Sequence, residues 1–514
     1  MDDTKNPQDM DDSMNLEEMF NEVDDRWLTH PLTSFDQAVD RQYVRRMFIF
    51  DFPDISMEAI RKAASSIYWG LKVAFDSFPF LTGCLGPLDD PIRKDLSQLR
   101  YGKTKELREI RPENFKWQYY RNSPYDPDYQ KLCAGGMPVS HWEMKEFCIA
   151  PAVVKLDEWP PVFTLQATFL KGGGLVLCFA FLQTIVDDAS ILLFLPAFAQ
   201  GCRAEAPPDE MPDALVYRPP DLSDYKNTFA NNTRDKFLEW NFVDQILAQG
   251  AVGIRGYSTR IFAIPAMIAK EWREKMYDFL TEHSLPQPVS TIDCISALAL
   301  VELIQARASI RPRRRKAEQV AFFTSVNARD RLSPPLLEPF FGNMHVKATG
   351  CMKTSVGRDT SKPRSEIDED EFGAYAAAAY RISRAAELIN DEHIRKRLSF
   401  LDNSPQPNAY NERTAAAMES PYFGLEIDCI AEYGADINFG IPGAGRGYVL
   451  PRREGGDADW EIMVCLPPPV MEHFNEEMKH WAFSSVDDYH PDSYGKYGRW
   501  FGNARVKEPE RFWQ

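Results

Sequence analysis

Long apolar runs are absent from this sequence, because nowhere do eighteen apolar residues follow one another without interruption. A helix that crosses a bilayer needs about 20 such residues, so we expect no membrane-spanning segment. The first residues, Met1 to Asp25, are acidic and contain no apolar core. They therefore fit neither a secretory signal nor a transit peptide.

Positive charge is outnumbered by negative charge, with 59 Lys and Arg residues against 76 Asp and Glu residues. The formal net charge is −17, whereas nucleic acids and anionic membranes both favour broad basic surfaces. We therefore expect neither as a partner. An anionic ligand would have to meet a local basic cluster, and the only dense one is the run Arg311-Pro-Arg-Arg-Arg-Lys316.

Cysteine spacings typical of disulfide frameworks or metal sites are missing. The nine cysteines lie scattered along the chain without a Cys-x-x-Cys pair, which indicates reduced thiols and a cytoplasmic location. No two histidines have the spacing of a helical metal site, and no Cys/His cluster supports zinc. Metal catalysis is therefore not expected.

The length and the hydrophobic content of the chain predict two well-packed domains. It contains 514 residues, of which 44% are hydrophobic, and a single core rarely grows beyond about 250–300 residues. The stretch from Ala204 to Pro220 is rich in Pro and Glu, as interdomain connections often are. We predict a flexible acidic leader (1–30), an N-terminal lobe (31–205), a connection (206–225), a C-terminal lobe (226–487) and a C-terminal extension (488–514).

Local patterns predict both strands and helices, which indicates an α/β fold. Ser56 is a candidate N-cap for a helix from Met57 to Phe78, and Ser290-Thr-Ile-Asp293 resembles a capping box ahead of a helix from Cys294 to Ala308. Leu175 to Gln183 is a continuous apolar run, as in a strand buried on both faces. Other predicted elements are strands at Met47–Phe52, Phe322–Val326 and Glu461–Leu466, helices at Ala189–Gln200 and Ala374–Leu401, and a mobile insertion at Met352–Glu371.

Several motifs carry a family resemblance. They are Leu32-Thr-Ser-Phe-Asp36, Phe78-Pro-Phe-Leu-Thr-Gly83, Gln183-Thr-Ile-Val-Asp187-Asp188, Ser290-Thr-Ile-Asp293, Val326-Asn-Ala-Arg329 and Phe340-Phe-Gly-Asn343. In order and spacing they resemble the BAHD acyltransferases, most clearly the fungal branch that includes the trichothecene acetyltransferases. The resemblance extends from about Leu32 to Phe483.

The resemblance implies a fold and a reaction. The fold is a chloramphenicol-acetyltransferase-like sandwich of two similar α/β lobes with a solvent channel between them. Acyl-CoA enters this channel as co-substrate from one side, and a small-molecule alcohol or amine enters from the other. The protein is expected to be a monomer.

Gln183 lies where the family has its catalytic histidine, since the motif His-x-x-x-Asp-Gly here reads Gln-x-x-x-Asp-Asp. In the family this histidine takes the proton from the acceptor. The amide of Gln183 can donate and accept hydrogen bonds, but it cannot take up a proton at accessible pH. Loss of a positioned general base typically costs a factor of roughly 10²–10⁴ in rate.

The two aspartates of the motif have different expected roles. Asp187 matches the family aspartate, which turns away from the channel and pairs with an arginine, and Arg329 matches that arginine. Asp188 replaces the family glycine. It is either an N-cap of the following helix or a new acid near the channel.

Three further groups are candidates for the site. His345, just after Phe340-Phe-Gly-Asn343, could replace the missing base, although most histidines are structural or exposed. Asp436 and Gly440 fall where the family has Asp-Phe-Gly-Trp-Gly, a loop that supports the channel, but the three positions between them differ. The basic residues Arg311, Arg313, Arg314 and Arg315 form a solvated loop, contact the CoA phosphates, or act as a nuclear import signal.

Two enzymatic functions remain open at this point. The first is an acyl-CoA-dependent O- or N-acyltransferase of fungal specialised metabolism, with the base supplied by the acceptor, a water or Asp188. The second is a cyclase or pericyclase that folds a polyketide- or terpenoid-type substrate and polarises it through Gln183 without CoA. A catalytically inactive paralogue is the non-enzymatic alternative.

Overall fold

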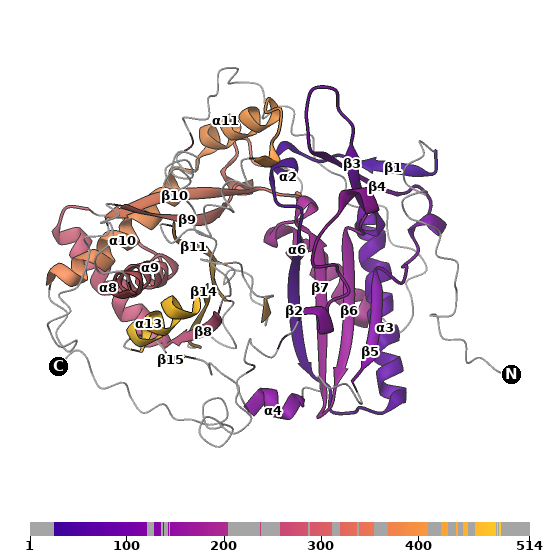
Figure 1. Cartoon of the computed structure of the whole chain (residues 1–514), viewed down its shortest axis with the longest axis horizontal. Coiled ribbons are helices and arrows are strands. Elements are labelled where there is room, and N and C mark those ends of the chain that lie inside the picture. The colour runs from indigo at the N-terminus through magenta and orange to yellow at the C-terminus, as the bar shows by residue number, and fades with distance from the viewer. Residues whose placement is uncertain are drawn as a thin grey trace.

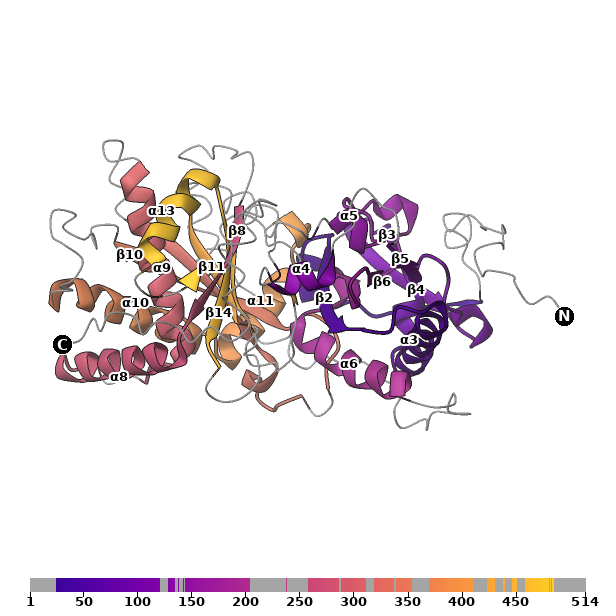
Figure 2. The same cartoon turned by 90° about the horizontal axis from the view of Figure 1, so that it is seen from below.

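The computed structural model places most of the chain in two lobes that lie side by side (Figures 1 and 2). It describes residues 25–120, 128–134, 137, 142, 144–203, 237, 258–285, 288–310, 319–336, 339–353, 369–409, 423–429, 438–439, 446–450, 458–479, 481 and 483–484. The predicted connection, 206–225, and the predicted C-terminal extension lie outside these residues. Both lobes are mixed α/β, which confirms the predicted fold class.

A five-stranded sheet forms the centre of the N-terminal lobe. Its strand order is β12-β2-β7-β6-β5, and its strands are β2 (Tyr43–Asp51), β5 (Phe115–Tyr119), β6 (Phe163–Leu170), β7 (Gly174–Leu182) and β12 (Asn438–Phe439). All nine residues of β7 are buried, as predicted from its apolar run. Helices α3 (Met57–Ser77) and α6 (Asp188–Arg203) pack against this sheet; both are visible below it in Figure 2.

The first strand of the described residues lies within the region predicted to be a flexible leader. Trp27–His30 form β1, which pairs with β4 (Leu96–Gly102), and β4 pairs in turn with β3 (Cys84–Leu88). The structure thus describes a strand at residues that the predicted leader (1–30) includes. The imidazole of His30 is buried and stacks on Phe80 at 4.1 Å between ring centroids, so this strand is anchored by a contact that is distant in sequence.

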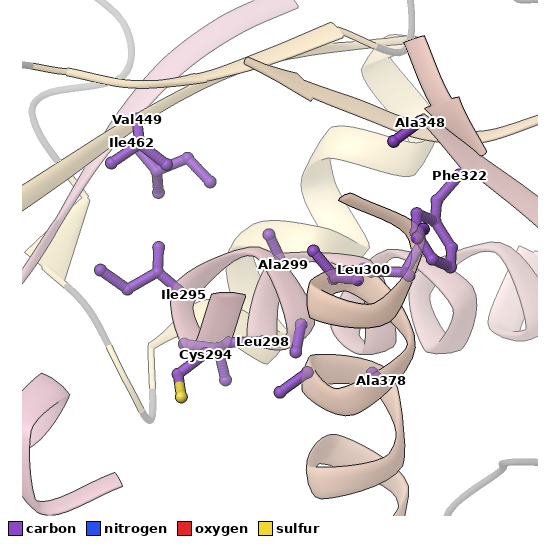
Figure 3. Packing of buried hydrophobic residues seen from close by; sticks show 14 of the residues in the cluster. Cys294, Ile295, Leu298, Ala299, Leu300, Phe322, Ala348, Ala378, Val449 and Ile462 are labelled. Carbon is purple, nitrogen blue, oxygen red and sulfur yellow. The ribbon is translucent and has the colours of Figure 1, made fainter. Parts of the chain in front are cut away.

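A seven-stranded sheet forms the centre of the C-terminal lobe, in the order β10-β9-β11-β13-β14-β8-β15. Its strands are β8 (Ser258–Ile264), β9 (Gln319–Asn327), β10 (His345–Lys353), β11 (Phe423–Cys429), β13 (Arg446–Val449), β14 (Trp460–Leu466) and β15 (Phe483–Ser484). The described helices of this lobe are α8 (Ala266–Glu282), α9 (Thr291–Ile310), α10 (Glu369–Glu387), α11 (Asp391–Asp402) and α13 (Pro468–Met478). The buried α9 lies between the sheet and α10, and side chains of all three meet in one core (Figure 3).

The predicted helix starts are present. Ser56 accepts a hydrogen bond from the Ala59 amide and caps α3. Ser290 and Asp293 form the reciprocal capping box of α9, with 3.1 Å from Asp293 N to Ser290 Oγ and 2.8 Å from Ser290 N to Asp293 Oδ2. The single helix predicted for Ala374–Leu401 is instead two, α10 and α11, because Asn390 caps a new helix by accepting from the His393 amide.

The C-terminal half of the sequence completes the N-terminal lobe at two places. β12 pairs with β2 through Met47 and Arg46, and Phe341 is buried in the N-terminal core between Phe78 and Phe80. In the part of the chain that the structure describes, the short α-helices are α2 (Ser34–Ala38), α4 (Tyr129–Ala134) and α5 (Met144–Phe147), which lie in the N-terminal half. Among the described residues, no helix is long and apolar enough to cross a membrane.

Candidate active site

Gln183 lies at the junction of the two lobes, directly after β7, in a 3-10 turn formed by Gln183–Ile185. Four hydrogen bonds fix it, one of which the Val186 amide donates to the Gln183 carbonyl at 3.3 Å. Its amide N–H donates to the Gln42 carbonyl at 2.8 Å, and its carbonyl accepts from Asn343 Nδ2 at 2.8 Å. Its side-chain Oε1 accepts from Gln42 Nε2 at 3.0 Å. With Oε1 engaged by Gln42, the Nε2 group of Gln183 is the part of this side chain that can donate to a ligand.

Asp187 accepts more hydrogen bonds than any other carboxylate of this junction. Both of its oxygens bind the Arg329 guanidinium, each at 2.8 Å. Its Oδ1 also accepts from the Ser190 amide at 3.0 Å and the Ser190 hydroxyl at 2.9 Å, and its Oδ2 from the Met344 amide at 2.9 Å. Arg329 also donates to the Gly342 carbonyl at 2.8 Å. The structure thus brings Asp187 and Arg329 together as a bidentate pair that joins the lobes.

His345, the first residue of β10, contacts the same carboxylate. Its Nδ1 lies 3.2 Å from Asp187 Oδ2, and 23% of its side chain is exposed. Burial lowers the pKa of this imidazole, but the charge of Asp187 and its hydrogen bond outweigh burial and raise the pKa above the usual value. Burial likewise opposes ionisation of Asp187, yet His345 and Arg329 hold the pKa of this carboxyl far below its usual range.

Asp188 is not the N-cap of the following helix, which corrects that interpretation. Asp187 takes this role, because its side chain accepts from the Ser190 amide and its carbonyl from the Ile191 amide. Asp188 is the first helical residue of α6 and forms an ion pair with Arg46 of β2. The acidic group that replaces the family glycine thus has a basic partner on the neighbouring strand.

Asp36 and Asn343 form a second link at this junction that the sequence did not predict. The buried Asp36 carboxylate accepts from Asn343 N at 2.8 Å and Nδ2 at 2.9 Å, and from Thr33 N and Oγ1 at 2.7 Å each. Burial raises the pKa of Asp36, although these hydrogen bonds oppose the shift. Asp36 and Asn343 each stand in a recognised motif, but only the fold shows that the two motifs bind each other beside Gln183.

Several predicted residues lie outside the described part of the chain. These are Asp436, Gly440 and the basic residues Arg311, Arg313, Arg314 and Arg315. Across the described ranges, no group of three or more His, Cys, Asp or Glu side chains is arranged to hold a metal ion.

The two-lobed fold and the motif turn at its junction define an enzyme of the acyltransferase class. Residues 141–481 match the family described as the transferase family. This match covers more than half of the sequence, and the chain therefore belongs to that family, the BAHD acyltransferases expected from the motifs.

Curated relatives and solved structures agree with this assignment. The chain is 23% identical over 499 residues to O-acetyltransferase ptmV of Penicillium ochrochloron, covering 86% of this chain and 94% of the relative. It is 23% identical over 498 residues to O-acetyltransferase astG of Aspergillus oryzae, covering 85% and 97%. F. graminearum TRI101 complexed with coenzyme A and T-2 mycotoxin has the same fold, with a TM-score of 0.71 at 16% identity over 89% of this chain and 100% of that one.

Proposed function

We propose that this protein transfers an acetyl group from acetyl-CoA to a hydroxyl group of a fungal specialised metabolite in the cytoplasm. The similarity to two fungal O-acetyltransferases along most of both chains supports this choice of donor and acceptor. TRI101 complexed with coenzyme A has the same fold and supports CoA as the carrier of the acyl group. The acceptor is a small molecule that binds between the lobes.

The hydrogen-bonded junction around Gln183 is the observation that carries this proposal. Asp187 and Arg329 join the lobes as a bidentate pair, and Asn343 ties the Gln183 carbonyl to Asp36. Loss of any one partner would leave a buried charge uncompensated and would destabilise the fold. The contacts that join the motifs at this junction therefore support a retained scaffold around position 183, although Asp188 also replaces the family glycine.

Gln183 has a supporting part in this reaction. Its Oε1 is bound to Gln42, so its Nε2 donates a hydrogen bond to the thioester carbonyl as negative charge develops there. A single positioned donor of this kind can contribute a factor of about 10²–10³ in rate. Asp436 and Gly440 are assigned to support of the channel, and Arg311, Arg313, Arg314 and Arg315 to the CoA phosphates, as the sequence predicts.

The test is release of free CoA. Purified protein is incubated with acetyl-CoA and a panel of polycyclic alcohols, and CoA and ester products are separated by liquid chromatography, because the chain's own thiols react with thiol reagents. We expect acceptor-dependent CoA release. No release over the whole panel, together with no binding of acetyl-CoA by calorimetry, would exclude the proposal.

Gln183→His is the companion variant. It places an imidazole where the family has one, so we expect transfer to become faster. Gln130→His is the matched control, because Gln130 is exposed on α4 and, within the described residues, its side chain donates only to the Gly172 carbonyl. An equal effect of both changes would show that position 183 is not at the reacting centre.

A second candidate function is a CoA-independent cyclase or pericyclase. The observation that favours it is Gln183 itself, a fixed hydrogen-bond donor without a proton-accepting atom. Such a reaction requires orientation and polarisation of one substrate rather than removal of a proton. Turnover of a reactive polyene without CoA, lost in Gln183→Ala, would support it; binding of acetyl-CoA with acceptor-dependent release of CoA would exclude it.

A further inference from the structure

The position of His345 on its strand determines which way its side chain faces. Along β10, Val346, Ala348 and Met352 are buried in the core of the C-terminal lobe. Successive side chains of a strand point to opposite faces, so His345 faces away from that core. It faces the N-terminal lobe, where its Nδ1 meets the Asp187 carboxylate at 3.2 Å.

The contact with Asp187 decides which ring nitrogen of His345 is available. Asp187 is ionised and accepts from Nδ1, so Nδ1 carries a proton and Nε2 is the nitrogen that can accept one. The described part of the chain provides no hydrogen-bond partner for Nε2, and 23% of the side chain is exposed. An imidazole oriented by a carboxylate at Nδ1 is the arrangement of a general base.

His345 is also close to the motif turn. Asn343, two residues before it, donates to the Gln183 carbonyl at 2.8 Å, and the Met344 amide donates to Asp187 at 2.9 Å. The charged groups that act on the imidazole are Asp187, Asp188 and Arg329. Of these, Asp188 is paired with Arg46, and Arg329 is paired with Asp187. His345 is therefore the side chain of this group that can be neutral near pH 7 and take up a proton.

We propose that His345 replaces the missing motif histidine as the general base of the transfer reaction, with Asp187 as its positioning residue. This inference rests on the proposed function. The acceptor oxygen bonds to the thioester carbonyl carbon while its proton moves to His345 Nε2. The tetrahedral intermediate then collapses, the carbon–sulfur bond breaks, and the same proton passes from Nε2 to the sulfur. The products are the ester and free CoA, and no electrons are gained or lost.

The variant that separates a base from a structural histidine is His345→Asn. The asparagine amide can donate to Asp187 in place of Nδ1, but it cannot accept a proton. We expect kcat to fall by roughly 10²–10⁴ with little change in the KM for acetyl-CoA. His283→Asn is the matched control, since His283 is exposed at the end of α8 and its side chain contacts the Phe279 carbonyl and ring, remote from Asp187 in the sequence.

Rescue provides an independent measurement. Adding Gln183→His to His345→Asn returns an imidazole to the motif position and should restore much of the lost rate. His345→Ala should likewise regain activity with added imidazole. The wild-type kcat/KM should rise with pH through one ionisation that coincides with the titration of the His345 imidazole followed by NMR, and this test applies even if a variant fails to fold.

The outcomes are distinguishable. If the wild type releases CoA and a folded His345→Asn protein retains the wild-type kcat and pH profile, His345 is not the base, although the proposed function stands. A wild-type pH profile that does not follow the His345 titration overturns the inference in the same way. If the wild type transfers no acetyl group to any acceptor, the proposed function fails, and the inference fails with it.

Discussion

At the scale of single residues, the site shows how one carboxylate can organise several motifs. Asp187 caps α6, pairs with Arg329 and contacts His345. The sequence identifies Asp187 and Arg329 as partners only through the family resemblance, since 142 positions separate them. The contact with His345 has no sequence signal beyond the presence of a histidine after Phe340-Phe-Gly-Asn343. Arg46 and Gln42, which hold Asp188 and Gln183, have no sequence signal at all.

The pairing of His345 with Asp187 predicts a pH-dependent contribution to stability. The pKa of His345 is raised in the folded state. Protonated His345 therefore stabilises the fold, and this contribution is fully present at a pH below the pKa of the unfolded chain, about 6.5. This contribution is lost as the pH rises through the folded pKa. Urea unfolding should therefore show a larger loss of stability for His345→Asn at pH 5.5 than at pH 9.

A loss that is the same at both pH values would contradict this prediction. Lys155→Gln is the control, because Lys155 forms an exposed ion pair with Glu158, and it should leave the free energy of unfolding nearly unchanged throughout. Asp187 acts in the opposite direction. The pKa of Asp187 is depressed in the folded state, so its ionised carboxylate stabilises the fold at a pH above the pKa of the unfolded chain, near 4. This contribution is lost as the solution becomes more acidic.

At the scale of elements, α3 and α6 pack closely against each other. A Cβ at Gly201 would lie 2.8 Å from Gly70 Cα and 2.8 Å from the Trp69 carbonyl oxygen. These are backbone atoms, which cannot move aside independently. The two helices thus approach each other through glycines, and α6 begins at Asp188, beside the site.

Gly201→Ala should force α3 and α6 apart. We expect a loss of about 1–3 kcal/mol in the free energy of unfolding, measured by urea denaturation. Gly373→Ala in α10 is the matched control, because its Cβ would meet only the Phe279 ring, at 3.1 Å. There the gain in helix propensity, up to about 1 kcal/mol, offsets the tighter contact. Equal losses in both variants would contradict the close approach at Gly201.

The sequence predicts elements well where the cause is local. The capping residues Ser56, Ser290 and Asp293 and the apolar run of β7 all act within a few neighbouring residues, and each is found as expected. It fails where the cause is distant. Trp27–His30 look like part of a polar leader until β4 and Phe80 provide partners. The break between α10 and α11 is a different failure, because its cause is local: Asn390 caps α11 within a pattern that otherwise predicts one helix.

At the scale of the whole molecule, the Phe340–Asn343 segment acts as a joint between the lobes. Phe340 belongs to the core of the C-terminal lobe and Phe341 to that of the N-terminal lobe. Phe341 lies 5.0 Å from Phe78 and 5.1 Å from Phe80 between ring centroids. Two adjacent residues therefore fill two different cores, which fixes how the lobes meet around Gln183.

Phe341→Ala should destabilise the N-terminal lobe more than the C-terminal lobe. Loss of a buried phenylalanine costs about 3–5 kcal/mol, and hydrogen exchange should become faster at residues 78–83 and in α3. Phe340→Ala, the matched control, should affect the C-terminal lobe near Arg329, whose guanidinium lies 5.5 Å from the Phe340 ring. The same exchange pattern in both variants would show that the two side chains do not serve separate cores.

The pairing of β12 with β2 has a consequence for recombination between relatives. The N-terminal sheet takes a strand from residues 438–439, so a crossover in the predicted connection at 206–225 would combine a sheet with an edge strand from a different parent. Expressed alone, the N-terminal half would present the uncovered edge of β2, which can pair with another copy. Chimeras of this family should therefore exchange β12 and the Phe340–Asn343 segment together with the N-terminal half, although both are encoded far downstream.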